Sequence, residues 1–96
     1  MCWVWDSHKS RINKLKHGLS FETARLVFDD PLAMSRPDPT PGEQRWQTVG
    51  LIGNAVVLVV HTWPEPEHER DEPTGRIISA RKATAHERRA YEETGF

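Results

Sequence analysis

Two strand-like segments joined by a tight turn limit the possible folds most strongly. From Arg45 to Leu51 the side chains alternate with a period of two, which predicts a β-strand with two different faces. Gly53-Asn54 is a two-residue turn signal, and the apolar run 55–60 that follows is typical of a central strand covered on both faces. The sequence therefore predicts a β-hairpin whose second strand lies inside a sheet.

Helices are expected before this hairpin. Asp6 is an N-cap signal for a helix to about Lys16, and Gly18 is a C-terminal stop. Ser20 begins a second helix, which ends before Pro31. Four apolar residues of the second helix recur at helical spacing and are expected to face the core: Phe21, Ala24, Val27 and Phe28.

The C-terminal part begins with a strand and ends with a helix. The segment from Arg76 to Arg81 alternates as a strand, and Thr84 and Glu87 have the capping-box spacing that predicts a helix to about Glu93. This helix is poor in large apolar residues, so it either packs closely through small residues or offers surface to another molecule. Fixed positive charge at such a strand-to-helix junction is well placed to hold a phosphate.

The remaining segments are short or rich in proline. Trp3-Val4-Trp5 is aromatic and β-prone, and the proline-rich segment 31–42 allows at most a short edge strand near 33–36. The segment 63–75 has three prolines and five acidic residues, which predicts a mobile acidic loop. We therefore expect a single α+β domain over residues 1–96. In it, N-terminal helices pack on one face of a three- to four-stranded antiparallel sheet, a C-terminal helix follows, and the second sheet face could be open.

The composition argues against secreted and membrane proteins. The only cysteine, Cys2, cannot form an intramolecular disulfide and favours a reducing setting. The longest apolar run, 55–60, is far shorter than the roughly 20 residues of a membrane span. The first eighteen residues carry scattered charges instead of the apolar core of a signal peptide. We therefore expect a soluble cytoplasmic protein.

The net charge of −1 conceals a separation of charge along the chain. Residues 1–18 carry a net +3 and residues 74–91 a net +4, whereas residues 19–73 carry −6. If the two basic ends meet in the fold, they would form a patch suited to a phosphate backbone. Two separate solvated helix faces are the alternative.

Several short blocks follow one another along nearly the whole chain. They are Trp5-Asp6 with Lys9 and Asn13, Lys16-His17-Gly18-Leu19-Ser20-Phe21-Glu22, Val27-Phe28-Asp29-Asp30-Pro31, Gly42-Glu43-Gln44-Arg45, Leu51-Ile52-Gly53, Arg76-Ile77-Ile78-Ser79-Ala80-Arg81-Lys82-Ala83-Thr84, Glu87-Arg88 and Tyr91-Glu92. In these blocks the chain resembles the BrnT toxins of bacterial type II toxin–antitoxin systems. The resemblance implies a RelE-like fold and a metal-independent endoribonuclease that binds RNA, inhibits translation and uses no cofactor.

The same resemblance implies a BrnA-like antitoxin as partner, in a hetero-oligomer that reaches DNA only through the antitoxin. Two features depart from the family pattern. The segment 64–73 is longer and more acidic than expected, and His61 stands where a tyrosine is commoner. Both departures could alter substrate access or weaken activity.

RNA cleavage without a metal ion needs a base for the 2′-hydroxyl, an acid for the leaving 5′-oxygen and cations for the charge on the phosphate. Arg81 and Lys82, helped by Arg76, are the first candidates for these cations, because guanidinium groups bind phosphate in a bidentate way. The alternative for Arg81 is an ion pair with Glu43 or Glu87 that only closes the structure.

The acid and the base are assigned less directly. His17 lies at a helix C-terminus, where the helix dipole favours protonated imidazole, so it is a candidate acid; a capping or interface role is the alternative. Glu43 and Arg45 flank a strand start and could serve as base and phosphate ligand, or form an ordinary surface ion pair. Further RNA-binding candidates are Lys9, Lys16 and Arg88.

Other residues have structural roles as the simpler interpretation. His61 follows the apolar run 55–60 and is expected to be a hydrogen-bonded core histidine. Trp46 and Trp63 are expected in the aromatic core, with stacking on bases as the alternative. The histidines and the cysteine include no pair at metal-ligand spacing, so no metal site is expected.

Three functions therefore remain to be distinguished. The main hypothesis is an endoribonuclease toxin neutralised by an antitoxin. The second is a non-catalytic nucleic-acid-binding or repressor-assembly module, in which the same cations bind phosphate without cleavage. The third is an interaction domain whose basic face docks an acidic partner.

Overall fold

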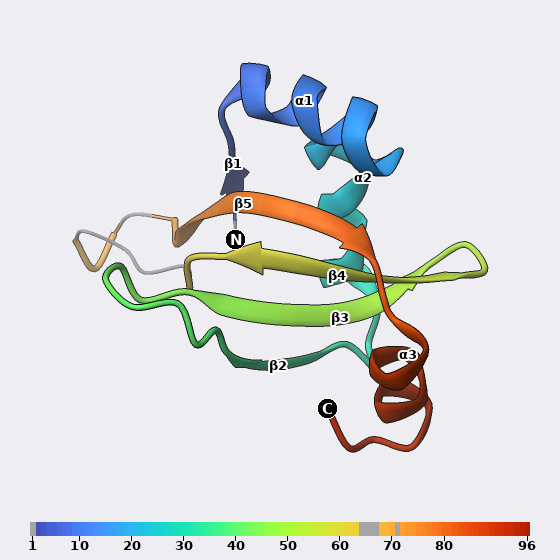
Figure 1. Ribbon diagram of the computed structural model, residues 1–96. Coiled ribbons are helices and arrows are strands. Elements are labelled where there is room, and N and C mark those ends of the chain that lie inside the picture. Colours follow the sequence, from blue (N-terminus) through green and yellow to red (C-terminus); the bar gives the residue numbers. More distant parts are fainter. Residues whose placement is uncertain (1, 64–67, 71) are drawn as a thin grey trace.

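The computed structural model describes residues 2–63, 68–70 and 72–96 (Figure 1). In chain order its elements are β1 (Cys2–Val4), α1 (Ser7–His17), α2 (Phe21–Ala24), the 3₁₀ helix η1 (Arg25–Asp29), β2 (Met34–Pro37), β3 (Trp46–Ile52), β4 (Ala55–His61), β5 (Thr74–Lys82) and α3 (Ala85–Glu92). The predicted α+β class is confirmed. No helix in the described ranges is long and apolar enough to cross a membrane.

The five strands form one sheet in the order β1-β5-β4-β3-β2. Strands β2 to β5 pair in the antiparallel sense, whereas β1 runs parallel to β5 with Cys2 opposite Thr74. The prediction of three to four antiparallel strands was therefore too low and missed the parallel pair. The β-prone segment at the N-terminus supplies the extra strand by pairing with a distant part of the chain.

The predicted hairpin is confirmed in its full length. β3 and β4 pair without interruption from Trp46 opposite His61 to Ile52 opposite Ala55. Gly53 makes the turn with a positive φ of 61°, a conformation that glycine adopts without strain. On the core face of β3, a Cβ at Gly50 would lie 2.9 Å from the carbonyl oxygen of Val27, so the glycine lets η1 approach the sheet closely.

Helix α1 lies along the outer edge of β5 (Figure 1). The Asp6 side chain accepts hydrogen bonds from two N–H groups of the first turn, and Gly18 ends the helix in the left-handed conformation. Both boundary predictions are confirmed. The side of α1 that is buried is polar, since Ser10 and Asn13 are its buried residues, while Leu15 is 89% exposed.

The second predicted helix consists of an α-helical part followed by a 3₁₀-helical part. α2 lasts four residues, and the chain continues as η1 up to Asp29. The predicted apolar stripe is nevertheless confirmed, because Phe21, Ala24 and Val27 are fully buried and Phe28 packs against the same cluster. The strand residues of this core are Val57, Val59, Ile77 and Ala80.

The other face of the sheet is not open at its centre. Val49 and Leu58, which are opposite each other on β3 and β4, are fully buried there. Helix α3 follows β5 at one end of the sheet (Figure 1), where the Tyr91 hydroxyl donates a hydrogen bond to Asp30. The C-terminal Phe96 ring lies 4.0 Å below the guanidinium group of Arg36 on β2.

Two predicted boundaries shift. β5 begins at Thr74 and ends at Lys82, so it takes two residues from the predicted acidic loop 63–75 and extends one residue beyond Arg81. Residues 64–67 and 71 of that loop lie outside the described residues. The predicted edge strand near 33–36 is confirmed as β2, and the capping box of α3 is formed by Thr84 and Glu87.

Candidate active site

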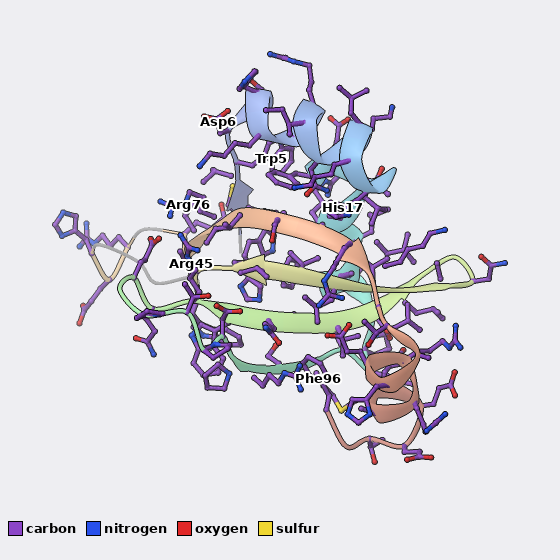
Figure 2. All side chains as sticks on the ribbon, viewed as in Figure 1. Trp5, Asp6, His17, Arg45, Arg76 and Phe96 are labelled. Carbon is purple, nitrogen blue, oxygen red and sulfur yellow. The ribbon has the colours of Figure 1, made fainter. Side chains whose placement is uncertain are left out.

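The structure separates the predicted site residues into three groups. The first, which we call the Glu43 cluster, consists of Glu43, Arg45 and Arg76. The second lies on α1 and consists of Lys9, Lys16 and His17. The third surrounds the β5–α3 junction and consists of Arg81, Lys82 and Arg88. Figure 2 shows Arg45 and Arg76 close together at one end of the sheet, while His17 lies toward its other end.

In the Glu43 cluster a carboxylate lies between two guanidinium groups. Arg76 Nη2 donates to both carboxylate oxygens of Glu43, at 2.8 and 2.7 Å. Arg45 Nε lies 3.7 Å from Glu43 Oε2, which is too long for a hydrogen bond. The cluster joins the loop before β3 to the start of β5, although β4 lies between these strands in the sheet.

A cavity of about 310 Å³ lies beside this cluster. Its lining includes Glu43, Trp46, Thr62 and Trp63. Thr62 also holds the start of β5, since its hydroxyl accepts a hydrogen bond from the Arg76 N–H at 2.9 Å. Thr62 was not predicted from the sequence; the available signal is its position directly after the apolar strand, between a histidine and a tryptophan.

Two properties of the cluster suit an anionic ligand. The Arg45 Nε atom is buried without a hydrogen-bond partner among the described residues. Glu43 and Arg76 are about half exposed, with side-chain exposures of 44% and 49%. An exposed ion pair of this kind contributes only about 0–1 kcal/mol, so a phosphate can displace the carboxylate from Arg76 at small cost. The arrangement can therefore bind a phosphate and leave a carboxylate beside it.

Arg81 adopts the ion pair that was the alternative to a catalytic role. Its Nη1 and Nη2 atoms lie 2.6 and 3.0 Å from the two carboxylate oxygens of Glu87. Glu87 also accepts a hydrogen bond from the Thr84 N–H at 2.9 Å as part of the capping box. The Arg81 hydrogen bond, with help from Thr84, lowers the pKa of Glu87 to about 2. In this arrangement Arg81 joins β5 to α3.

Lys82 and Arg88 lie beside a different cavity, of about 290 Å³, near the turn of the hairpin. In the capping box at this junction the Glu87 carboxylate accepts from the Thr84 N–H and the Thr84 hydroxyl accepts from the Glu87 N–H. The strand-to-helix junction therefore offers two cationic side chains beside a helix start that carries the predicted capping box.

One family model matches this chain, over residues 5–87, and its description is "Ribonuclease toxin, BrnT, of type II toxin-antitoxin system". The chain belongs to the BrnT family. The matched range includes the Glu43 cluster and the α1 group, and it ends one residue before Arg88. Membership makes the protein a ribonuclease toxin with an antitoxin partner. No curated protein gives a significant match.

In this BrnT-family chain the two basic ends do meet, because α1 packs on β5. Lys9, Lys16 and His17 line a cavity of about 210 Å³ between the helix and this strand. Arg76 and Arg81, on the same strand, direct their guanidinium groups to Glu43 and Glu87 instead. The predicted meeting of the ends is confirmed, but the strand arginines are paired with carboxylates and do not join the α1 cations.

His61 is a buried and fully hydrogen-bonded histidine, as predicted. Its Nδ1 atom lies 2.8 Å from the Thr62 carbonyl oxygen and its Nε2 atom 2.6 Å from the Thr48 hydroxyl. Burial lowers the pKa of His61. The prediction of core positions for both tryptophans was wrong for Trp63, which is 48% exposed, whereas Trp46 is half-buried. In the ranges that the structure describes, no group of three or more histidine, cysteine, aspartate or glutamate residues could hold a metal ion.

Proposed function

We propose that this BrnT-family protein is an endoribonuclease that cleaves RNA at the Glu43 cluster without a metal ion. The observation that carries the proposal is the position of Glu43 between Arg76 and Arg45, beside an open cavity with an exposed tryptophan. These groups supply a proton acceptor, two phosphate ligands and a surface on which a base can stack.

In the proposed reaction the scissile phosphate takes the place of Glu43 on Arg76. Arg45, whose buried Nε lacks a hydrogen-bond partner in the described ranges, donates to the same phosphate. The displaced carboxylate of Glu43 accepts the proton of the 2′-hydroxyl, and the 2′-oxygen forms a bond to phosphorus. The bond from phosphorus to the 5′-oxygen breaks, and the leaving oxygen takes a proton from water in the open cavity. The products are a 2′,3′-cyclic phosphate and a 5′-hydroxyl.

The other predicted site residues bind the RNA farther along the molecule, toward the other end of the sheet. Lys9, Lys16 and His17 line the α1 cavity, and Lys82 and Arg88 line the cavity at the hairpin turn. Contacts of this kind neutralise phosphates and give salt-dependent affinity. We assign Arg81 to the ion pair with Glu87, because the RNA would have to break a short bidentate bridge to use it.

The toxin acts in the cytoplasm by inhibiting translation, and its partner is a BrnA-like antitoxin in a hetero-oligomer. The toxin reaches DNA only through that antitoxin. Family membership supports these proposals, since type II systems pair a toxin with an antitoxin.

The proposal is tested with purified protein and RNA in the presence of EDTA. Wild type should cut the RNA, whereas Glu43→Gln and Arg76→Ala should cut it at least 100-fold more slowly, as expected for loss of a general base or a phosphate ligand. Glu22→Gln and Arg25→Ala are matched controls on the exposed surface of the α2–η1 segment and should retain activity. Full activity of Glu43→Gln would rule out the assigned base, and inhibition by EDTA would rule out metal-free cleavage.

The second candidate is a non-catalytic nucleic-acid-binding or repressor-assembly module. The observation that favours it is the pairing of Arg76 with Glu43 and of Arg81 with Glu87, which leaves neither arginine directed at an open phosphate site. In that case wild type should bind RNA and leave it intact, and expression of the chain alone in bacteria should not arrest growth.

A further inference from the structure

A second cavity, of about 230 Å³, shares Trp63 with the cavity beside the Glu43 cluster. Trp63 lines both cavities, so its half-exposed ring is a shared wall. The second cavity is also lined by Trp3 and Phe28, whose rings stack with centroids 3.8 Å apart. His61 meets both of these rings edge-on, at 5.1 and 4.9 Å. The cavity is therefore bounded by flat aromatic groups from β1, η1 and the end of β4.

A series of hydrogen bonds connects three polar side chains, from the buried His61 through Thr48 to Ser35 at the rim of this cavity. The Thr62 carbonyl can only accept, so His61 Nδ1 carries a proton and donates to it at 2.8 Å. Burial lowers the pKa of His61 and keeps the ring neutral, so Nε2 is an acceptor for the Thr48 hydroxyl at 2.6 Å. The Thr48 oxygen, 2.7 Å from Ser35 Oγ, then accepts the Ser35 proton.

This series of hydrogen bonds determines whether the rim of the cavity offers donors or acceptors to a ligand. Because Ser35, an exposed residue, uses its only proton on Thr48, its oxygen offers lone pairs and no donor to a ligand. Asp30 also lines this cavity, and its carboxylate already accepts from the Leu32 and Leu51 N–H groups and from the Tyr91 hydroxyl. The polar side of the cavity therefore matches a flat ligand whose edge carries N–H donors.

We propose that this cavity binds a nucleobase with an exocyclic amino group, which is adenine, cytosine or guanine in preference to uracil. Both exocyclic groups of uracil are carbonyl oxygens, and such an oxygen facing Ser35 Oγ leaves it without a donor. The one donor on this edge of uracil, the N3–H, lies between the two oxygens. This inference rests on the proposed function: the bound nucleotide is a neighbour of the scissile phosphate, because Trp63 lines both this cavity and the one beside the Glu43 cluster.

The test uses binding of fluorescently labelled 2′-O-methyl oligonucleotides of A, C or U. These probes lack the free 2′-hydroxyl, so binding is measured without cleavage. For wild type, the A and C probes should bind about 2-fold to 12-fold more tightly than the U probe, as expected for one additional hydrogen bond. Trp63→Ala should weaken binding of all probes by about 5-fold to 150-fold through loss of stacking.

Further variants test the contribution of the Ser35 hydroxyl separately from that of the Trp63 ring. Ser35→Ala should bring the ratio of A to U affinity toward one, and Ser7→Ala, which removes an exposed serine hydroxyl on α1, should leave the ratio unchanged. Trp63→Phe keeps a ring and should retain most of the affinity, which distinguishes loss of stacking from loss of folding in Trp63→Ala. Circular dichroism melting checks each variant.

The proposal is overturned if folded wild type binds none of the probes or binds A and U equally. It is also overturned if Ser35→Ala keeps the wild-type ratio, or if Trp63→Ala binds as wild type does. Failure of the ribonuclease proposal is a separate result, because it is measured with unmodified RNA: preference for A and C without cleavage would retain the base cavity and reject the cleavage mechanism.

Discussion

The side-chain amide of Asn13 pairs with both backbone groups of Ala80. Asn13 Nδ2 donates to the Ala80 carbonyl at 2.8 Å, and the Ala80 N–H donates to Asn13 Oδ1 at 3.3 Å. The same Nδ2 donates to the Leu19 carbonyl at 2.8 Å. One side chain on α1 thus replaces a neighbouring strand at this point of β5, where β1 does not reach.

Replacement of Asn13 by alanine should destabilise the protein by roughly 1–3 kcal/mol, because buried backbone groups of Ala80 lose their partners. Urea unfolding followed by circular dichroism measures the change. Ile12→Ala is the matched control on the same helix, since Ile12 is 47% exposed, and it should cost less than about 0.5 kcal/mol. Equal effects of the two substitutions would contradict the edge-pairing role of Asn13.

The Arg81–Glu87 pair should make the protein sensitive to acid. Since the pKa of Glu87 is lowered from 4.5 to about 2, the unfolded state binds more protons than the folded state between these values. The stability contributed by Glu87 is therefore present above about pH 4.5 and is lost as the pH falls toward about 2. Glu87→Gln should cost roughly 2–3 kcal/mol at pH 7.

The measurement for this pair is urea unfolding of wild type and Glu87→Gln from pH 2 to pH 7. The difference between their free energies of unfolding should be constant above pH 4.5 and nearly vanish at pH 2. Glu93→Gln controls for loss of a carboxylate at the exposed end of α3. A difference that stays constant down to pH 2 would show that the ionised form of Glu87 is not responsible.

His61 should produce a second loss of stability, at higher pH. Burial lowers the pKa of His61 from 6.5, so below that value the unfolded state takes up a proton that the folded state resists. The stability of the wild type should therefore fall as the pH decreases below about 6.5. His61→Asn, whose side chain does not titrate, should lack this slope between pH 5 and pH 6.5. An NMR titration of the His61 ring gives an independent check, and an ordinary pKa there would refute the prediction.

Gly50→Ala should be destabilising because of the close approach of η1 to β3. The new Cβ would lie 2.9 Å from the Val27 carbonyl oxygen and 3.0 Å from Val27 Cγ1. Overpacking of a core of this kind typically costs about 1–3 kcal/mol. Gly95→Ala is the control, since a Cβ at Gly95 meets nothing within 4 Å. Thermal melting distinguishes the two, and a Gly50→Ala melting temperature equal to that of wild type would refute the contact.

The predictable parts of the fold are those with local signals. The hairpin depends on alternation and on Gly53-Asn54, and the helix boundaries depend on Asp6, Gly18 and Thr84; all of these lie within a few residues of the feature they define. The parallel pairing of β1 was missed because a three-residue strand carries little pattern and its partner begins at Thr74. The polar anchoring of α1 was also missed, because burial was inferred from apolar residues.

In the candidate site, too, features with local sequence signals were predictable and features that depend on distant parts of the chain were not. The Arg81–Glu87 pair could be foreseen as an alternative, since the two residues are six apart and flank a helix start. Glu43, Arg45 and Arg76 were each predicted, but their joining at one cluster depends on the strand order, which places β4 between β3 and β5. The base cavity could not be predicted, because its aromatic walls come from three separate elements.

Asn13 and Ala80 are 67 residues apart in the chain, and β1 pairs with the beginning of β5. A ribosome adds roughly 5–20 residues per second, so the N-terminal strand and helix wait several seconds for the strand that completes their hydrogen bonds. During synthesis neither the edge of β5 nor Arg76 exists, and the Glu43 cluster cannot form. We expect the toxin to become competent for cleavage only after nearly all of the chain has been made, which leaves an interval in which an antitoxin already present can bind the emerging chain.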